Sequence, residues 1–327
     1  RCQMKHWVVI PALAALLMAQ PAAAQQQAPS QDDEAVTELP SIDVRARAQR
    51  DVIESFVQAV TASPGHQGQV AQFNGAVCPG VVNLPAIPAQ AINDRIARLA
   101  LSLNLKVGEP GCKANVLIIA ADGADRVASE LVAMAPSVFE TRDQSWRGRE
   151  RRAAFLAPGQ PARWWHISRT ETGVFAGMSW SATPANAGPG AADHGLSGTG
   201  APVGGGYGGN ISSRGAVTNI TGAIVVLDTR EIGRVGVNAL GDYVAMIALA
   251  RLEPNADVGG LNTVLRLFQD DETRLAIEGL TPWDRAYLDG VYSAKRDALH
   301  AGWQEQEIAR SMQRTLSGDG RTALADQ

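Results

Sequence analysis

One stretch of the sequence, residues 222–251, constrains the fold more than any other. It opens with five consecutive apolar residues, Ala223-Ile224-Val225-Val226-Leu227, between Gly222 and Asp228. A short apolar run bounded in this way predicts a fully buried strand. Apolar residues then recur at helical spacing over 238–251, so a helix should follow. A buried strand that feeds a buried helix is typical of α/β proteins.

Two further strands are predicted, at residues 115–121, which are almost entirely apolar, and at 163–170, where the residues alternate. Amphipathic helices are predicted at 49–62, 88–104, 122–135 and 300–316. The fold class is therefore α+β (mixed α/β). It has a small central sheet with strands near 115–121, 163–170 and 223–228, packed by amphipathic helices, and a helical C-terminus.

Several polar residues are predicted to begin helices. Asp122 should cap the helix at 122–135, whose buried face would carry Val127, Leu131 and Met134. Thr281-Pro282-Trp283-Asp284 is a clear helix start, with Thr281 as N-cap and Asp284 placed to answer it. Residues 142–152 hold five arginines, which indicate a solvated helix or, less simply, an anion-binding surface.

Both ends of the chain differ in composition from its middle. Met4-Lys5-His6, the apolar run 7–18 and the A-x-A site at Ala22–Ala24 predict a signal peptide over 1–24, with residues 1–3 upstream of the start Met and cleavage after Ala24. The apolar run is too short for a membrane anchor, the alternative interpretation, and no later run is long enough to span a bilayer. The expected location is periplasmic or secreted.

The remaining domains follow from composition. Residues 25–48 are polar and Pro-rich and predict a disordered leader. Within it, 39–44 would form either an edge strand or a short docking motif. A single globular domain is expected over 49–316, with a Gly-rich loop insertion at 181–215 and a disordered tail at 317–327.

Signal cleavage would leave two of the three cysteines, Cys78 and Cys112. An even number of cysteines in an exported protein predicts a disulfide, the alternative being two buried free thiols. Two isolated cysteines without a nearby histidine make a poor zinc site.

Chemical motifs are scarce in the sequence. It has no G-x-S-x-G, Walker or kinase signature and no H-x-x-x-H pair. The candidate catalytic residues are His166, in a predicted strand, Asp228, at the end of the central strand, and Asp242, in the following helix. For each of them a structural role is the simpler interpretation. No cofactor and no metal site are predicted, and a net charge of −4 argues against nucleic-acid binding.

The chain resembles a family of exported alphaproteobacterial proteins to which no activity is assigned. The resemblance covers most of residues 50–315. It rests on Cys78-Pro79, Gly111-Cys112-x-x-Asn115-Val-Leu-Ile, Trp165-His166, Leu240-Gly-Asp242-Tyr243-x-Ala245-Met246 and Leu280-Thr281-x-Trp283-Asp284-x-x-Tyr287-Leu288.

The C-terminal half is also similar in layout to zincin metalloproteases, in which a strand leads to a helix that bears H-E-x-x-H. Here residues 238–242 fill the five motif positions. Asn238 and Asp242 replace the two histidines, and Ala239 replaces the general-base glutamate. The resemblance thus implies a zincin-like fold whose metal motif has been lost.

These observations favour a protein without enzymatic activity that binds a small ligand or an envelope protein, or that acts as an envelope scaffold. The alternative is an envelope hydrolase whose site is assembled from His166, Asp228 and Asp242. The two hypotheses differ on one structural point, which is whether these three side chains meet in a cleft.

Overall fold

The computed structural model describes residues 41–62, 69–139, 146–172, 216–298 and 301–325. The chain divides into two units, residues 1–41 and 42–327, and the described elements belong to the second except for the first residue of α1. The predicted signal peptide, most of the predicted leader and the Gly-rich insertion 181–215 lie outside the described residues.

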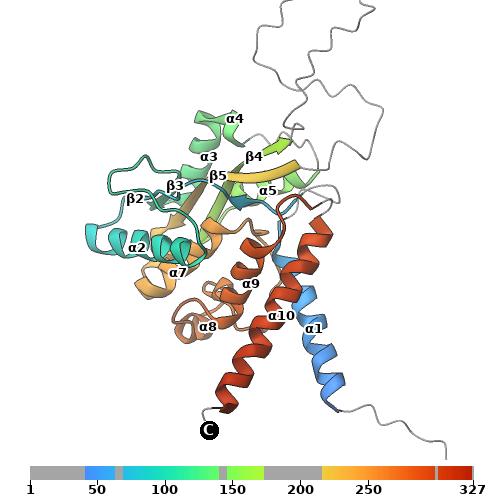
Figure 1. The fold of residues 1–327 in the computed structure, drawn as a ribbon. Helices are drawn as coiled ribbons and strands as arrows, with labels where there is room; N and C mark the ends of the chain where they lie inside the picture. Colours follow the sequence, from blue (N-terminus) through green and yellow to red (C-terminus); the bar gives the residue numbers. More distant parts are fainter. Residues whose placement is uncertain (1–40, 63–68, 140–145, 173–215, 299–300, 326–327) are drawn as a thin grey trace, which may run out of the picture. The chain divides into compact units, whose positions relative to one another are not determined.

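A five-stranded mixed sheet forms the centre of the second unit (Figure 1). The strands β2 (Pro79–Val82), β3 (Val116–Ala121) and β5 (Ala216–Asp228) run parallel to one another, and β3 lies between the other two. The short β1 (Gln72–Phe73) also pairs with β5 in parallel. On the opposite edge of β5, β4 (Ala162–Thr172) runs antiparallel over its whole length, with a bulge between Ile167 and Ser168.

Helices cover both faces of this sheet. On one face lie α3 (Ala124–Met134), α4 (Pro136–Phe139) and α5 (Trp146–Leu156). Their core is an aromatic cluster in which the rings of Phe139, Phe155 and Trp165 lie 5.1–6.3 Å apart between centroids. Trp165 of β4 and Val226 of β5 belong to the same cluster. This face of the sheet is therefore apolar, and the layer of α3, α4 and α5 buries it.

The other face carries the larger core. It is covered by α1 (Ser41–Val60), α2 (Ala86–Ser102), α7 (Val237–Leu249), α9 (Pro282–Ser293) and α10 (Ala301–Ala325). The short helices α6 (Thr229–Ile232), η1 (Val264–Arg266) and α8 (Asp271–Ala276) connect them. Residues 239–249 of α7 are buried without exception, because this helix lies between the sheet, α2 and η1.

The fold class and the three strand positions predicted from the sequence are confirmed. The structure adds β1 and β2, for which the sequence predicted no strand. Pro79 is tolerated as the first residue of β2 because this strand lies at the edge of the sheet. Pairing with β3, which is distant in sequence, supplies the order that local propensity does not.

The predicted start of α3 is wrong. Its N-cap is Gly123, in the left-handed region at φ 79°, and no side chain caps the helix. The Asp122 side chain is 85% exposed and lies 3.7 Å from the Arg230 Nε instead. The buried face carries Ala124, Ala128 and Val132. The expected Val127 and Leu131 are partly buried and pack against the same core, whereas Met134 is exposed.

Two helices extend beyond their predicted ends. α1 begins at Ser41. The predicted edge strand or docking motif at 39–44 is therefore helical over residues 41–44, the part of it that the structure describes. α10 continues to Ala325, past the predicted end at 316. In α10, Ile308 and Met312 are buried, whereas Trp303 is half exposed.

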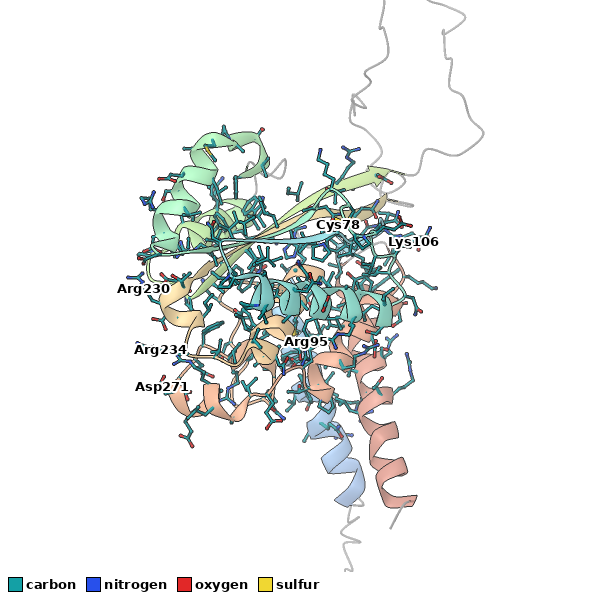
Figure 2. All side chains as sticks on the ribbon, turned by 90° about the vertical axis from the view of Figure 1, so that its left-hand side faces the viewer. Cys78, Arg95, Lys106, Arg230, Arg234 and Asp271 are labelled. Atoms are coloured by element: carbon teal, nitrogen blue, oxygen red, sulfur yellow. A yellow bond between two sulfur atoms is a disulfide. The ribbon has the colours of Figure 1, made fainter. Side chains whose placement is uncertain are left out.

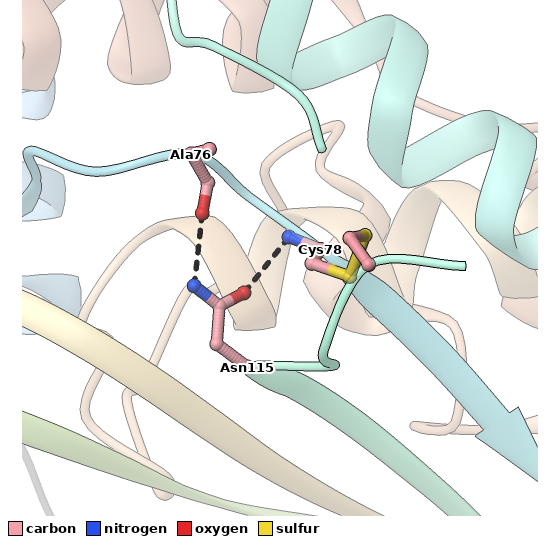
Figure 3. The surroundings of a disulfide bond; sticks show 4 residues. Ala76, Cys78 and Asn115 are labelled. Carbon is pink, nitrogen blue, oxygen red and sulfur yellow. Dashed lines mark hydrogen bonds between the residues drawn. A yellow bond between two sulfur atoms is a disulfide. The ribbon is translucent and has the colours of Figure 1, made fainter. Parts of the chain in front are cut away.

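The predicted disulfide between Cys78 and Cys112 is present, with a Cα–Cα distance of 6.1 Å (Figure 3). Beside it, the Asn115 Oδ1 accepts a hydrogen bond from the Cys78 N–H at 2.8 Å, and the Asn115 Nδ2 donates to the Ala76 carbonyl at 2.9 Å. The disulfide and the Asn115 amide therefore fix the start of β2 against the start of β3. Cys78 and Arg230 mark opposite ends of the sheet in Figure 2.

A search of the described residues for a membrane-crossing helix found none with the necessary length and hydropathy.

Candidate functional site

A hollow of about 530 Å³ runs beside β4. Its floor is formed by seven consecutive residues of this strand, Trp164–Thr170, together with Thr218 and Thr221 of β5. Pockets that bind small molecules commonly have volumes of roughly 300–1,000 Å³, so the hollow is large enough for a ligand.

The two walls of the hollow come from the two helical layers. One wall is formed by Ser137 and Val138 of α4 and Gly148 and Arg151 of α5, and the other by Arg251, Leu252 and Pro254 after α7. Each wall is fixed to the strand by a buried tryptophan.

The two indoles point to opposite faces of the sheet and donate in opposite directions. The Trp165 Nε1 donates to the Val138 carbonyl at 2.9 Å, and the Trp164 Nε1 donates to the Leu252 carbonyl at 3.2 Å. An ion pair of 3.5 Å between Arg151 Nη2 and Glu253 Oε1 then joins the walls to each other. The width of the hollow is thus set by contacts within the fold.

The lining residues give the hollow a basic character. Arg151, Arg169 and Arg251 reach it from three different segments, and its described lining includes no Asp or Glu. Ser and Thr hydroxyls occur on the same surface. Guanidinium groups and hydroxyls are the donors with which proteins bind carboxylate and phosphate groups.

His166 lies in this hollow and is neutral there. Burial and the charges of Arg251 and Arg151 lower its pKa from 6.5 to about 3. The His166 Nε2 lies 3.2 Å from the Ala248 carbonyl, which can only accept a hydrogen bond, so Nε2 carries the proton. His166 therefore positions β4 against the end of α7 and offers Nδ1 as its one remaining acceptor.

Asp228 lies at a different end of the sheet. Its carboxylate accepts hydrogen bonds from the Arg230 N–H at 3.0 Å and from the Arg230 guanidinium, which makes it the N-cap of α6. The hydrogen bond from the Arg230 side chain lowers the pKa of Asp228. In the strand register His166 lies opposite Ala223, five residues before Asp228. At about 3.3 Å per residue, some 16 Å of strand separates the two residues.

Asp242 is buried on a third surface, between α7 and α2. Its carboxylate accepts two hydrogen bonds from the Arg95 Nη1, at 3.0 and 2.8 Å, and one from the Leu280 N–H at 3.0 Å. His166, Asp228 and Asp242 each have different partners and do not converge. The structure therefore does not bring these three side chains together in one site.

Two of the three substituted positions of the zincin motif have packing roles. Asn238 is exposed, Ala239 is buried in the core, and Asp242 binds Arg95. Asp284, in the first turn of α9, is fully buried and accepts hydrogen bonds from Thr281 and Thr263 and from the Val264 N–H. In the described parts of the chain, no three His, Cys, Asp or Glu side chains are grouped to bind a metal ion.

Sequence reasoning found one residue of the hollow, His166, and missed the three arginines around it. Arg151 was assigned to a solvated helix, and Arg169 and Arg251 lie at the ends of a predicted strand and helix. One signal was present, namely the excess of arginine at 142–152. The chain distance between residues 151 and 251 concealed their convergence.

Among known protein families, curated proteins and solved structures, none matches this chain.

Proposed function

We propose that this protein is a non-catalytic binding protein of the periplasm or the extracellular space, and that the hollow beside β4 binds the carboxylate groups of a ligand. The observation that carries the proposal is the meeting of Arg151, Arg169 and Arg251 around one hollow. Its described lining contains no carboxylate, although Arg151 also pairs with Glu253 beside it. A ligand carboxylate placed there would gain charge-assisted hydrogen bonds.

Binding without catalysis is supported by the state of His166. With a pKa of about 3, its ring is a poor base near neutral pH, where a general base works best if its pKa lies close to the pH of the reaction. Its Nε2 faces the Ala248 carbonyl rather than a hydroxyl group. Thr221, in turn, donates its hydroxyl to the Ile167 carbonyl. These contacts favour a binding surface over a nucleophile and base pair.

An exported location agrees with the Cys78–Cys112 disulfide, because such bonds persist in oxidising compartments. The signal peptide remains the main argument for export. Mass spectrometry of the protein recovered from the periplasm should find Gln25 as its first residue, and a mature form that keeps Met4 would contradict the proposal.

Isothermal titration calorimetry with acetate, succinate, citrate and inorganic phosphate tests the binding proposal. We expect di- and tricarboxylates to bind more tightly than acetate, and we expect Arg251→Gln and Arg169→Gln to weaken them by about tenfold each, the loss of one charge-assisted hydrogen bond. Arg234→Gln is the matched control, because Arg234 is exposed after α6 and does not line the hollow. Equal affinity in all three variants, or hydrolytic turnover in an ester and peptide screen, would overturn the proposal.

A further inference from the structure

We propose that the outer edge of β4 binds an extended acidic peptide, which adds to the sheet as a further strand. This inference rests on the proposed function and names the class of ligand: a peptide segment with Asp or Glu side chains. It is drawn from three features of the hollow, which are the way β4 lines it, the direction of the main-chain groups of β4, and its charge.

The first feature is that consecutive residues of β4 line the hollow. Side chains along a strand alternate between the two faces of the sheet, so a hollow over one face would be lined by every second residue. Here all seven residues of Trp164–Thr170 contribute. The walls likewise come from both helical layers, α4 and α5 on one side and Arg251, Leu252 and Pro254 on the other. The hollow therefore wraps around the edge of β4, and Thr218 and Thr221 of β5 extend it beyond that strand.

The second feature is the direction of the main-chain groups. The Asp228 N–H donates to the Pro161 carbonyl at 2.9 Å, and β4 continues from there in antiparallel register with β5. Because hydrogen-bonded pairs recur at every second residue, Arg163 and Trp165 direct their N–H and C=O groups toward β5. Trp164 and His166 alternate with these residues and direct their N–H and C=O groups toward the outer edge of β4. In the described chain β5 is the only strand that pairs with β4.

An incoming strand would thus find donors and acceptors in the spacing of a sheet. The seven residues that line the hollow correspond to about 23 Å of extended chain. Beyond the bulge, residues 168–171 of β4 are exposed. This geometry suits binding by strand addition, in which the main chain gives affinity and side-chain pockets give specificity.

The third feature, charge, selects the occupant. Arg151 and Arg251 stand on opposite walls and Arg169 extends from β4 itself. A second copy of the chain that paired through β4 would bring the same arginines together, and their like charges would repel it. Charged side chains at exposed sheet edges commonly oppose pairing in this way. A strand with Asp or Glu side chains brings opposite charges to the same positions. The acidic peptide is therefore the occupant that the surface favours.

Fluorescence anisotropy of a labelled seven-residue peptide of alternating Val and Glu, titrated with the purified protein, tests the inference. We expect saturable binding that weakens about tenfold in Arg251→Gln and remains unchanged in Arg234→Gln. A peptide in which Lys replaces Glu should not bind. The Val/Glu peptide with N-methyl groups at alternate residues keeps its charge but loses the donors of one edge, and it should bind at least about tenfold more weakly.

Hydrogen exchange measured by NMR locates the contact. The amides of Trp164 and His166 should exchange more slowly with the peptide bound, and amides of the opposite edge strand β2 should not change. The inference is overturned if the N-methylated peptide binds as well as its parent, or if these two amides show no added protection. It is also overturned if sedimentation shows a dimer in which they are already protected. Citrate binding that depends on Arg251, without any peptide binding, would refute the strand addition and leave the proposed function standing.

Discussion

The carboxylate of Asp242 on α7 accepts two hydrogen bonds from the Arg95 Nη1 on α2, at 3.0 and 2.8 Å. Arg95 is labelled in Figure 2, on the face of the molecule that α2 covers. The glycine before Asp242 makes this contact possible, since a Cβ at Gly241 would lie 2.9 Å from the Arg95 Cγ. A Cβ at Gly279 would likewise clash with the Asp242 Oδ2. The Leu240-Gly241-Asp242 sequence thus has a packing explanation that requires no metal.

Replacing Asp242 with alanine should destabilise the protein by about 3 kcal/mol. The change leaves the Arg95 guanidinium and the Leu280 N–H without their shared acceptor in a largely buried position. Urea unfolding of the variant measures the loss. Asp289→Ala is the control, because Asp289 forms an exposed pair with Arg285 within one helix and should cost less than about 1 kcal/mol. Equal losses in the two variants would contradict the role given to Arg95.

Ile247→Ala should destabilise the protein by about 2–5 kcal/mol. Ile247 is fully buried in α7, in the larger core, and its truncation removes apolar contacts and leaves a cavity. Val237, at the first position of the same helix, is 39% exposed. Thermal and urea unfolding of Val237→Ala should therefore show a loss of no more than about 1 kcal/mol, and a similar loss for both variants would argue against the assigned packing of α7.

Breaking the Cys78–Cys112 disulfide should cost about 3–4 kcal/mol, the chain-entropy value for its sequence separation of 34 residues. Denaturant midpoints of the native protein, the protein with dithiothreitol and the Cys78→Ser/Cys112→Ser variant measure this difference. Thiol labelling of the non-reduced, denatured protein should find no free thiol at either position. Two labelled cysteines in protein recovered from the periplasm would refute both the bond and its contribution.

His166 should make the protein less stable in acid. Its folded pKa, about 3, lies below the ordinary value of 6.5, because burial and the charges of Arg251 and Arg151 disfavour the imidazolium. Between pH 6.5 and 3 the unfolded chain binds a proton that the folded chain does not, so this contribution is fully present above pH 6.5 and is lost as the pH falls through that window.

The His166→Gln variant isolates this contribution. Between pH 7 and pH 4.5 the native protein should lose up to about 2 kcal/mol more unfolding free energy than the variant. Urea unfolding at both pH values gives the comparison, and glutamine keeps a donor for the Ala248 carbonyl. Identical pH dependence in the two proteins would mean that His166 titrates normally in the folded state.

Some features of this protein are determined locally, and the sequence was sufficient to predict them. The strand at Ala223–Leu227 follows from its apolar run, and the helix start at Thr281 follows from a capping box that the structure contains. The Asp228 cap also depends on neighbours in the chain. The pairing of Cys78 with Cys112 followed from the number of cysteines. In each case the interacting groups are adjacent in sequence or, for the disulfide, one pairing remains once Cys2 is assigned to the predicted signal peptide.

Other features were decided only by the tertiary structure. β2 is ordered by its register with β3, and α3 has the left-handed backbone of Gly123 at its N-cap, not the side chain of Asp122. The hollow beside β4 joins residue 151 to residue 251, and its basic character comes from side chains whose separate local patterns predicted only helix and strand. Periodicity records which face of an element is apolar. It carries no information on which distant element will cover that face, because that choice depends on packing and charge between segments that meet only when the chain is folded.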